Sequence, residues 1–356
     1  MGQALPPFDD GAMPEQAGLE ETPMLSPMRL HTHDVGEQAE RLRHWDQTYV
    51  QLSPGGFEGR IVEGWFGSIQ VFRETTTQVI HEQGKSRNGS QTICLPVAMS
   101  GVARFRGADW TPNACATLGG GQDFDLCTPG TLDVVAVSLP CDRLLDIAET
   151  QGINADAVRR ALSTRSLLSL RPGSGEALRC MLVELTSLME SDSALLTNRL
   201  ARLGIEAAIY DTTVRLIADA IHEVPAVTPA AYLPHRSVVY QAIDYVESRS
   251  SEMVSVNDLC AALRVSRRTL QMYFDEVLQV SPLQYLRARR LNRVRNKLRH
   301  GDGVLSIGQA ASDCGFWHMS QFAMDYRKLF GELPSETVAR FGGTGRERLP
   351  SGSLPD

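Results

Sequence analysis

The spacing of hydrophobic positions changes twice along the chain. Between residues 61 and 139, apolar and β-branched side chains alternate with polar ones in short runs, which predicts β-strands. Turn residues separate the runs at roughly ten-residue intervals, which is typical of a small barrel or sandwich. We predict eight strands: Ile61–Glu63, Trp65–Arg73, Thr77–His81, Gln91–Met99, Val102–Phe105, Ala114–Leu118, Gln122–Leu126 and Leu132–Leu139.

From Cys141 onward the spacing becomes three and four, which predicts helices over residues 141–152, 154–164, 174–191 and 194–222. Residues 34–50 also fit a short amphipathic helix. The proline-containing stretch 224–235 predicts an interdomain linker. We expect residues 1–28, which are acidic and rich in Pro and Gly, and residues 341–356 to form disordered tails.

Two helix-turn-helix units follow one another between residues 256 and 336. In the first unit, Leu270, Phe274 and Val277 share one helix face, and Ser266 precedes that helix as an N-cap. The second unit repeats the plan about 50 residues later, with a turn at Cys314-Gly315-Phe316. Its buried faces are predicted to hold Ile307, Ala310, Ala311, Phe322, Tyr326 and Leu329.

The units are joined by SPLQYLRARRLNRVRNKLRH, where Pro282 suits the first turn of a helix. With GFWHMSQFAMDYRKLFGELPSE in the second unit, this segment makes residues 236–340 resemble the DNA-binding domain of the AraC/XylS family of transcription regulators. Two residues depart from the family pattern, because Arg264 and Gln279 stand where the family usually has glycine. Both positions favour left-handed backbone, so we expect the first unit to be the less regular or less stable one.

The resemblance implies an architecture for the rest of the chain. The fold class is then α+β multidomain, with a cupin-like β-barrel over residues 29–140 that binds an effector, and an all-α double helix-turn-helix domain over residues 236–340. Residues 141–223 form a helical region between them. For its long segment 194–222 two interpretations stay open, namely that its apolar face packs on the barrel or that it pairs two subunits in a homodimer, as the resemblance implies.

The resemblance also assigns residues to DNA. Its base-facing positions correspond to Arg268, Gln271, Met272, His318, Ser320, Gln321 and Met324. Arginine can donate two hydrogen bonds to guanine, and glutamine can pair with adenine. Arg267 and Arg327 are expected to contact backbone phosphate, which orients the protein without reading sequence.

Charge distribution favours localised contact with double-stranded DNA, although the whole chain has a net charge of −7. Residues 236–340 contain 15 Arg or Lys and 11 Asp or Glu, whereas residues 1–235 contain 18 and 29. Seven of the basic residues lie between Arg287 and Arg299, with no acid among them. A basic segment beside an acidic partner domain suits nucleic acid at one place rather than polyanions in general.

The sequence gives little support for a catalytic metal site, for disulfide bonds or for a membrane span. The predicted β-region contains one histidine, His81, so we expect no catalytic metal site in the barrel, no cofactor and no enzyme. The seven cysteines are odd in number and form no CxxC pair, which indicates reduced thiols in a cytoplasmic protein. We predict no membrane span, because no apolar run approaches the length of a bilayer.

Candidate effector contacts are the residues expected to face into the barrel: Trp65, Phe72, Arg73, Arg104, Phe105 and Trp110. An aromatic ring beside an arginine would suit a small organic acid. The alternative is that these residues are ordinary barrel core and surface arginines. The sequence does not name the ligand.

We therefore predict a sequence-specific DNA-binding transcription regulator of the AraC/XylS type. The preferred form is a ligand-responsive activator of a neighbouring metabolic operon, acting with RNA polymerase. One alternative is a constitutive DNA-binding regulator whose N-terminal domain is purely structural. The other is a cupin-type enzyme tethered to DNA, which the histidine count disfavours.

Overall fold

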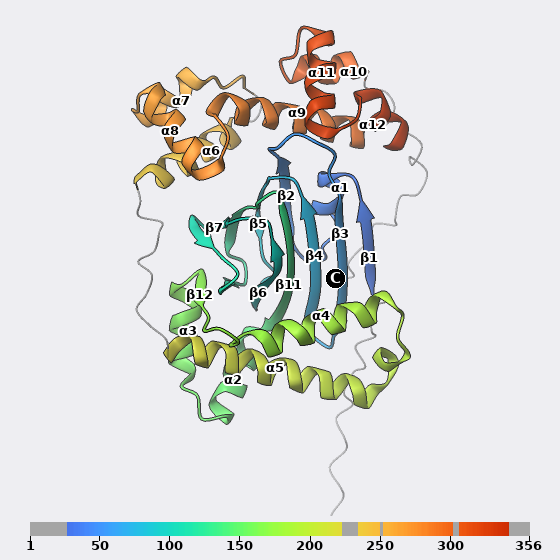
Figure 1. Cartoon of the computed structure of the whole chain (residues 1–356), viewed down its shortest axis with the longest axis vertical. Coiled ribbons are helices and arrows are strands. Elements are labelled where there is room, and N and C mark those ends of the chain that lie inside the picture. Colours follow the sequence, from blue (N-terminus) through green and yellow to red (C-terminus); the bar gives the residue numbers. More distant parts are fainter. Residues whose placement is uncertain (1–26, 223–233, 250–251, 302–305, 342–356) are drawn as a thin grey trace, which may run out of the picture.

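Figure 1 shows the computed structural model, in which β-structure lies between two helical regions at opposite ends of the long axis. The structure describes residues 27–222, 234–249, 252–301 and 306–341. The tails expected over residues 1–28 and 341–356 fall mostly outside this range, as does most of the expected linker 224–235.

The β-structure consists of two antiparallel sheets. The larger has the order β1-β3-β4-β11-β6-β9-β12, and the smaller has the order β2-β5-β10-β7-β8. The larger sheet comprises β1 (Met28–Thr32), β3 (Gly59–Phe66), β4 (Ile69–Thr77), β6 (Ser90–Met99), β9 (Ala114–Gly119), β11 (Thr131–Pro140) and β12 (Leu167–Ser169). The smaller comprises β2 (Asp46–Gln51), β5 (Ile80–Lys85), β7 (Ala103–Phe105), β8 (Ala108–Trp110) and β10 (Asp123–Cys127).

The predicted strand Trp65–Arg73 is wrong, because a hairpin interrupts it. β3 ends at Phe66 and β4 begins at Ile69, with Phe66 opposite Ile69 in the ladder. Gly67 makes the turn with φ of 56°, a left-handed conformation that glycine adopts at little cost. Apolar residues on both sides of this two-residue turn make the hairpin look like one long strand in the sequence.

The predicted helix over residues 34–50 is only partly correct. Asp34 caps α1 (Val35–Ala39) by accepting from the Glu37 backbone N–H, and the helix ends after five residues. β2 begins at Asp46 and pairs with β5, so that Tyr49 lies opposite Glu82. Thr48, Tyr49 and Val50 favour a strand, and this sheet partner overrides the weak helical periodicity.

Four helices cover the β-structure at the end away from the C-terminal domain (Figure 1): α2 (Cys141–Thr150), α3 (Ala155–Thr164), α4 (Glu176–Glu190) and α5 (Arg199–His222). These confirm the helices expected after Cys141, with a short 3-10 turn at Ala194–Thr197 before α5. The C-terminal part of α5 packs into the core through Ile209, Val214 and Ile217. At its N-terminal end Leu200 and Leu203 remain exposed, at 79% and 52%.

The C-terminal domain is entirely helical: α6 (Pro234–Ser248), α7 (Val256–Leu263), α8 (Arg267–Leu278), α9 (Pro282–His300), α10 (Ile307–Asp313), α11 (Met319–Phe330) and α12 (Pro334–Phe341). The predicted N-cap is confirmed, since the Ser266 side chain accepts from the Thr269 backbone N–H. Pro282 opens α9 as expected, and Ser281 and Gln284 form a capping box there. The buried faces of α8 and α11 contain the six residues predicted for them: Leu270, Phe274, Val277, Phe322, Tyr326 and Leu329. The expected fold class, α+β multidomain with an all-α C-terminal domain, is confirmed, and the region expected to be a cupin-like β-barrel consists of the two antiparallel sheets.

Two helices of the first unit end on non-glycine residues in left-handed conformation. Arg264 caps α7 with φ of 54°, and Gln279 caps α8 with φ of 57°. The equivalent position after α11 is Gly331, with φ of 75°. A side chain at such a position costs about 1–2 kcal/mol relative to ordinary backbone, so the first unit carries strain that the second does not at this point.

We expect Arg264→Gly and Gln279→Gly each to stabilise the protein by about 1 kcal/mol, because glycine relieves the left-handed strain. Thermal unfolding of the full chain measures the effect as a rise in the midpoint. The matched control is Gly152→Ala, which introduces left-handed strain at a φ of 74° where an added Cβ meets no neighbouring atom, and it should lower the midpoint. A fall after both glycine substitutions would show that the side chains of Arg264 and Gln279 stabilise the fold by more than their backbone strain costs.

Candidate nucleic-acid interface and its contact with the β-structure

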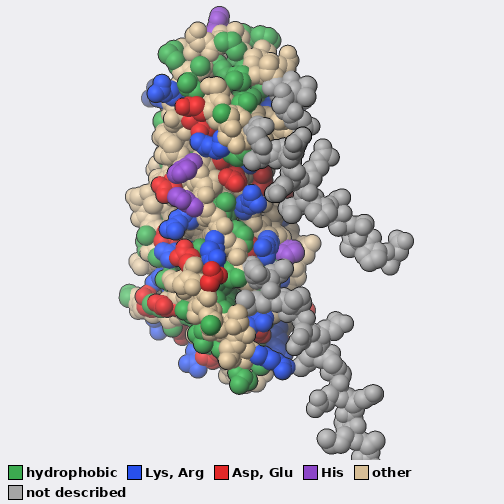
Figure 2. Space-filling model, turned by 90° about the vertical axis from the view of Figure 1, so that its right-hand side faces the viewer, with side chains coloured by type: hydrophobic (Ala, Val, Ile, Leu, Met, Phe, Trp, Pro, Cys, Tyr) green, Lys and Arg blue, Asp and Glu red, His purple; other side chains and the backbone are tan. Residues whose placement is uncertain are grey.

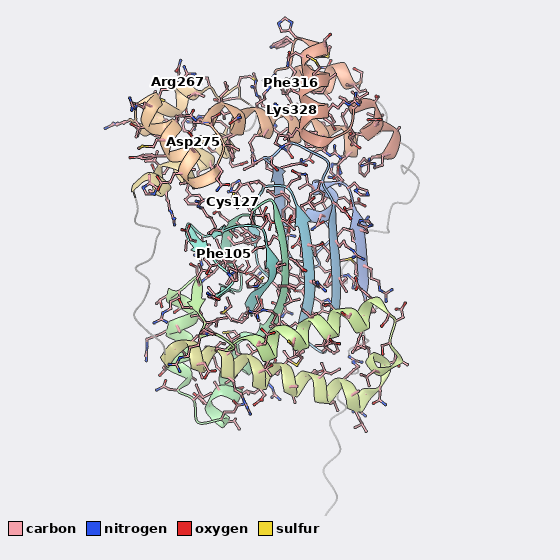
Figure 3. The ribbon with its side chains drawn as sticks, viewed as in Figure 1. Phe105, Cys127, Arg267, Asp275, Phe316 and Lys328 are labelled. Carbon is pink, nitrogen blue, oxygen red and sulfur yellow. The ribbon has the colours of Figure 1, made fainter. Side chains whose placement is uncertain are left out.

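The first candidate reading helix, α8, exposes one face to solvent along most of its length. Arg267, Arg268 and Met272 are exposed and Gln271 is half-buried. Ser266 holds the start of the helix, while Leu270 and Phe274 anchor the opposite face in the core. Figure 3 places Arg267 at the outer side of the domain and Asp275 nearer the β-structure, so the helix begins far from the β-structure and runs toward it.

The second candidate reading helix, α11, is built in the same way. His318, Ser320, Gln321 and Met324 are all exposed, as is Arg327. Phe322 and Tyr326 pack inward, with ring contacts to Phe316 and Phe330. The structure thus exposes the predicted base-facing residues in two groups, one on each unit. Figure 2 shows apolar side chains gathered at the outer end of the molecule; the exposed apolar residues of this unit are Trp317, Met319 and Met324.

Each reading helix contains the same internal hydrogen bond. The Gln271 side-chain amide donates to both oxygens of Asp275 at 2.9 Å, and Gln321 donates to Asp325 at 3.0 Å. Both pairs have a spacing of four residues, which brings the side chains together on one helix face. An amide NH2 group has two donor hydrogens, so Gln321 keeps one for a base while it is bound to Asp325, and both carbonyl oxygens are free of these bonds.

Trp317 is a candidate contact that the sequence-based prediction missed. It lies directly before the N-cap of α11 and is 75% exposed. A large aromatic side chain so exposed is uncommon unless a partner covers it. The signal in the sequence was its position between Phe316, which is buried, and His318, where the reading helix begins.

Most of the cations on the connecting helix α9 are bound within the protein. Arg287 pairs with Asp325, Arg289 with Glu247, Lys297 with Asp313, and Arg295 and Arg299 both with Asp34. Arg290 lies over the Phe316 ring, with 5.3 Å between the guanidinium carbon and the ring centroid. The cluster of seven basic residues therefore supplies less free charge to DNA than the sequence implies. Arg267 and Arg327, predicted to contact phosphate, remain exposed and form no ion pair within the described residues.

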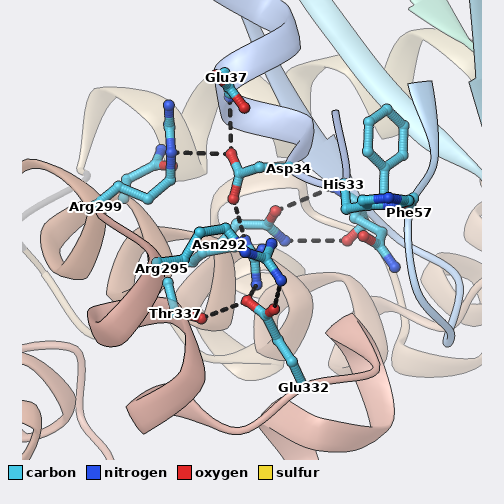
Figure 4. Close-up of polar contacts among 12 residues, drawn as sticks. His33, Asp34, Glu37, Phe57, Asn292, Arg295, Arg299, Glu332 and Thr337 are labelled. Carbon is cyan, nitrogen blue, oxygen red and sulfur yellow. Dashed lines mark hydrogen bonds and ion pairs between the residues drawn. The ribbon is translucent and has the colours of Figure 1, made fainter. Parts of the chain in front are cut away.

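Asp34 ties α9 to the N-terminal domain (Figure 4). Its carboxylate is almost fully buried and faces Arg295 Nε at 2.6 Å and Arg299 Nε at 2.9 Å. Arg295 also pairs with Glu332 at 2.9 Å, and Arg299 with Glu40 at 3.0 Å. Burial acts to lower the pKa of Arg295, but its interactions with Asp34, Tyr326 and Glu332 leave that pKa above its usual value. We call Asp34, Glu40, Arg295, Arg299 and Glu332 together the Asp34 cluster.

Further contacts surround this cluster. Asn292 accepts from the Gln51 backbone N–H at 3.1 Å and donates to the Gln51 carbonyl at 3.0 Å, like an additional residue in the ladder of β2. Arg104 of β7 donates to the Val277 carbonyl at the end of α8. Val50 and Cys127 belong to the same apolar core as α6, α8 and α9, and Figure 3 shows Cys127 where the β-structure meets the helices. The domains thus share one core, and the reading faces stay outside it.

The candidate effector residues fall into two groups. Phe72, Phe105 and Trp110 line a cavity inside the β-structure. Trp65, Arg73 and Arg104 do not: Trp65 donates to Glu63, Arg73 forms a two-pronged ion pair with Asp133, and Arg104 faces α8. The arginines expected to accompany the aromatic rings are therefore engaged elsewhere.

Two features are absent from the part of the chain that the structure describes. No group of three or more His, Cys, Asp or Glu side chains is arranged to hold a metal ion in that part of the chain. Likewise, no helix within the described ranges is long and apolar enough to cross a bilayer.

The C-terminal domain contains two helix-turn-helix units joined by one long helix. Each unit exposes its second helix, which is the element that enters the major groove in DNA-binding domains of the helix-turn-helix class. A family model described as a helix-turn-helix domain matches residues 259–340. This part of the chain is similar to the corresponding region of curated transcription regulators, in line with the resemblance to the AraC/XylS family.

Two curated relatives show the extent of the match. XylDLEGF operon transcriptional activator 3 of Pseudomonas putida is 33% identical over 101 residues, which cover 28% of this chain and 30% of the relative. The probable thc operon regulatory protein of Rhodococcus erythropolis is 32% identical over 114 residues, or 31% of this chain and 33% of the relative. The chain spans about a third of the length of these relatives. Among solved structures, the AraC-like transcriptional activator CuxR is 16% identical with a TM-score of 0.39, covering 76% of this chain and 96% of that one.

We expect Asp34→Asn to weaken the docking of the C-terminal domain by about 3–5 kcal/mol, because two buried guanidinium groups lose their shared countercharge. Hydrogen–deuterium exchange of α1 and α9 should report faster exchange in both. The matched control is Asp192→Asn, whose exposed pairing with Arg29 contributes at most about 1 kcal/mol. Equal exchange in the two variants would contradict the assigned role of Asp34.

Proposed function

We propose that this chain is a sequence-specific DNA-binding transcription regulator of the AraC/XylS type, and that it is a ligand-responsive activator of a neighbouring metabolic operon. The observation that carries the proposal is the paired construction of α8 and α11. Both are anchored by an apolar face, both leave the opposite face exposed, and one helix, α9, joins their units.

In this proposal α8 and α11 enter successive major-groove segments on one face of the duplex, roughly 34 Å apart. Arg268 and the glutamines Gln271 and Gln321 contact base edges, while Met272 and Met324 contact thymine methyl groups. His318 and Ser320 lie at the start of α11 and take part in the same readout. Arg267 and Arg327 bind phosphate, and Trp317 packs against the backbone beside them.

Regulation follows from the contact between the domains. The Asp34 cluster and the Asn292–Gln51 pairing fix α9 against β2, so the β-structure sets the position of both reading helices. An effector inside the β-structure changes this contact and thereby how the reading helices meet DNA or RNA polymerase. The shared apolar core favours this mechanism over the alternative of a constitutive regulator with a purely structural N-terminal domain.

The remaining parts of the proposal concern location and assembly. The protein acts in the cytoplasm, where promoter DNA is present, and performs no catalysis. Leu200 and Leu203, exposed at the start of α5, are the candidate contact for a homodimer.

We expect Arg268→Ala and Gln321→Ala each to cost about 1–3 kcal/mol of binding to the preferred duplex and to relax base preference at one position. Selection from a randomised duplex library, followed by fluorescence anisotropy at fixed salt, measures both effects. Arg160→Ala, an exposed arginine on α3, is the control and should bind like the parent. If both variants kept the parent's base preferences, the assignment of α8 and α11 as reading helices would be wrong.

Arg327→Ala should behave differently from Arg268→Ala. Loss of a phosphate contact weakens binding to all sequences about equally and reduces the slope of log affinity against log salt by about one. Anisotropy titrations at several salt concentrations, on preferred and scrambled duplexes, separate the two classes. A change in base preference without a change in slope would move Arg327 to the base-facing group.

A further inference from the structure

The two sheets enclose a cavity of about 70 Å³, in the region where Figure 3 labels Phe105. Strands of both sheets contribute to its wall, and most of the wall is aromatic or aliphatic. Its aromatic residues are Trp45, Tyr49, Phe72, Phe105, Trp110 and Phe124. The small volume limits an occupant to a compact group unless the wall moves.

The two indole rings offer the cavity little hydrogen-bonding capacity. Trp45 Nε1 donates to the Gln70 side chain at 3.2 Å, and Trp110 Nε1 donates to the Ala114 carbonyl at 3.0 Å. The Trp45 ring meets Phe72 and Phe124 edge to face, each at 5.7 Å between centroids. What these rings present to an occupant is therefore π surface, which attracts apolar groups and cations.

Two carboxylates reach the same cavity. Glu74 of β4 and Glu82 of β5 both line it, and they are 8% and 4% exposed. Gln38 Nε2 and the Tyr49 hydroxyl both donate to Glu74 Oε1, at 2.8 and 2.9 Å. Glu82 lies opposite Tyr49 in the β2–β5 ladder, and its charge acts on the same hydroxyl. One phenol thus stands between two buried acids, and it has a single proton to donate.

No cation within the described residues compensates these acids. Neither forms an ion pair with Lys, Arg or His in that part of the chain, and the cavity wall contains none of these residues. Burial raises the pKa of Glu74, and burial together with the Glu74 charge raises that of Glu82 well above its usual value. Burial and the same charges raise the pKa of Tyr49 and of Cys94, which also line the cavity. Another polar residue of the wall, Gln47, has its buried Nε2 without an acceptor.

We propose that this cavity binds a compact organic cation, a primary or quaternary ammonium compound, whose charge lies against Glu74 and Glu82 and whose apolar part lies against the aromatic rings. The assignment rests on the proposed function, because it names the effector class for the N-terminal domain. A bare metal ion fits poorly, since it requires more oxygen ligands than two carboxylates and a phenol. A small organic acid, expected from the sequence, would face two acids and no cation in the cavity wall.

The cavity is separated from the DNA-binding domain by the thickness of one sheet. Tyr49 and Glu82 lie opposite each other in the β2–β5 ladder, and so do the next residues, Val50 and His81. Val50 packs in the apolar core with α9, and the His81 ring lies 6.2 Å from that of Tyr285 on α9. A cation that draws Tyr49 and Glu82 together therefore acts on the strand pair that carries α9.

The first experiment compares ligand classes on the unmodified full chain. Alkylammonium ions of one to six carbons and tetramethylammonium are titrated by calorimetry and by tryptophan fluorescence, since Trp45 and Trp110 lie in the wall. The alcohols and carboxylates of equal length are the matched neutral and anionic probes. We expect saturable binding of an ammonium compound, at least about tenfold tighter than its alcohol and with no binding of its carboxylate. Equal binding of the alcohol, preference for the carboxylate, or no binding of any ammonium probe would overturn the proposal.

The second experiment tests the two acids. Glu82→Gln and Glu74→Gln should each weaken ammonium binding at least about tenfold, whereas Glu58→Gln, an exposed acid on the outer surface, should leave it unchanged.

The parent's affinity should rise with pH, because the raised pKa values leave the carboxyls partly protonated and the bound cation favours their ionised form. The groups facing this pair from β2 and β6 are Tyr49 and Cys94, and the other wall residues do not titrate. Unchanged binding in both cavity variants would also overturn the proposal.

We expect the cavity variants to fold, so a loss of ammonium binding would not be explained by unfolding. A carboxyl whose pKa is raised by folding destabilises the native state above its ordinary pKa, so Glu82→Gln should raise the thermal midpoint at neutral pH. Anisotropy with the selected duplex, run on the same samples, separates the two proposals. DNA binding without ammonium binding refutes the ligand class alone, whereas ammonium binding without DNA binding refutes the proposed function.

Discussion

The pairing of one buried aspartate with two arginines holds this molecule in a single arrangement. Asp34 caps the first helix of the N-terminal domain and neutralises Arg295 and Arg299 of α9, so it joins parts of the chain that are 261 residues apart. Its removal would leave each buried guanidinium with one carboxylate, Glu332 or Glu40, in place of two, which is costlier than losing a surface pair. The geometry of the reading helices is thus set by a carboxylate in the other domain.

That arrangement separates the cations of α9 from those of the reading helices. Lys297 and four of its arginines, including Arg287 and Arg289, are neutralised within the protein, while Arg267 and Arg327 of the reading helices remain available. The basic character of the sequence segment is therefore mainly a means of docking α9 between its neighbours. In the proposed function, contact with DNA therefore falls to fewer side chains.

The sequence predicts the C-terminal domain well because its signals are local. Leu270, Phe274 and Val277 recur at helical spacing, and Ser266 caps by a contact three residues away. The helix over residues 34–50 and the strand over 65–73 failed for a different reason, because strand pairing and a two-residue turn decide those segments. Asp34 and α9 meet only in the folded chain, so no spacing rule could have joined them.

The sequence predicts the aromatic residues of the cavity wall but not its two acids. Phe72, Phe105 and Trp110 follow from alternation, since aromatic residues on strands usually face inward. Glu74 and Glu82 do not, because a charged residue on a strand is normally expected to face solvent. The sequence predicts Arg73 and Arg104 beside the rings, because it does not show which strand residues face the cavity. In the structure Arg73 pairs with Asp133, and Arg104 donates to the Val277 carbonyl.

The two-residue repeat of β2 and β5 constrains how this protein can evolve. On these strands, neighbouring residues serve opposite sides of the wall: Tyr49 and Glu82 face the cavity, and Val50 and His81 face α9. Inserting or deleting one residue would exchange the two sets, placing an acid against the helix and a valine in the cavity. The lengths of these two strands therefore cannot drift between species as loop lengths do, and the pocket's chemistry can change only by substitution in place.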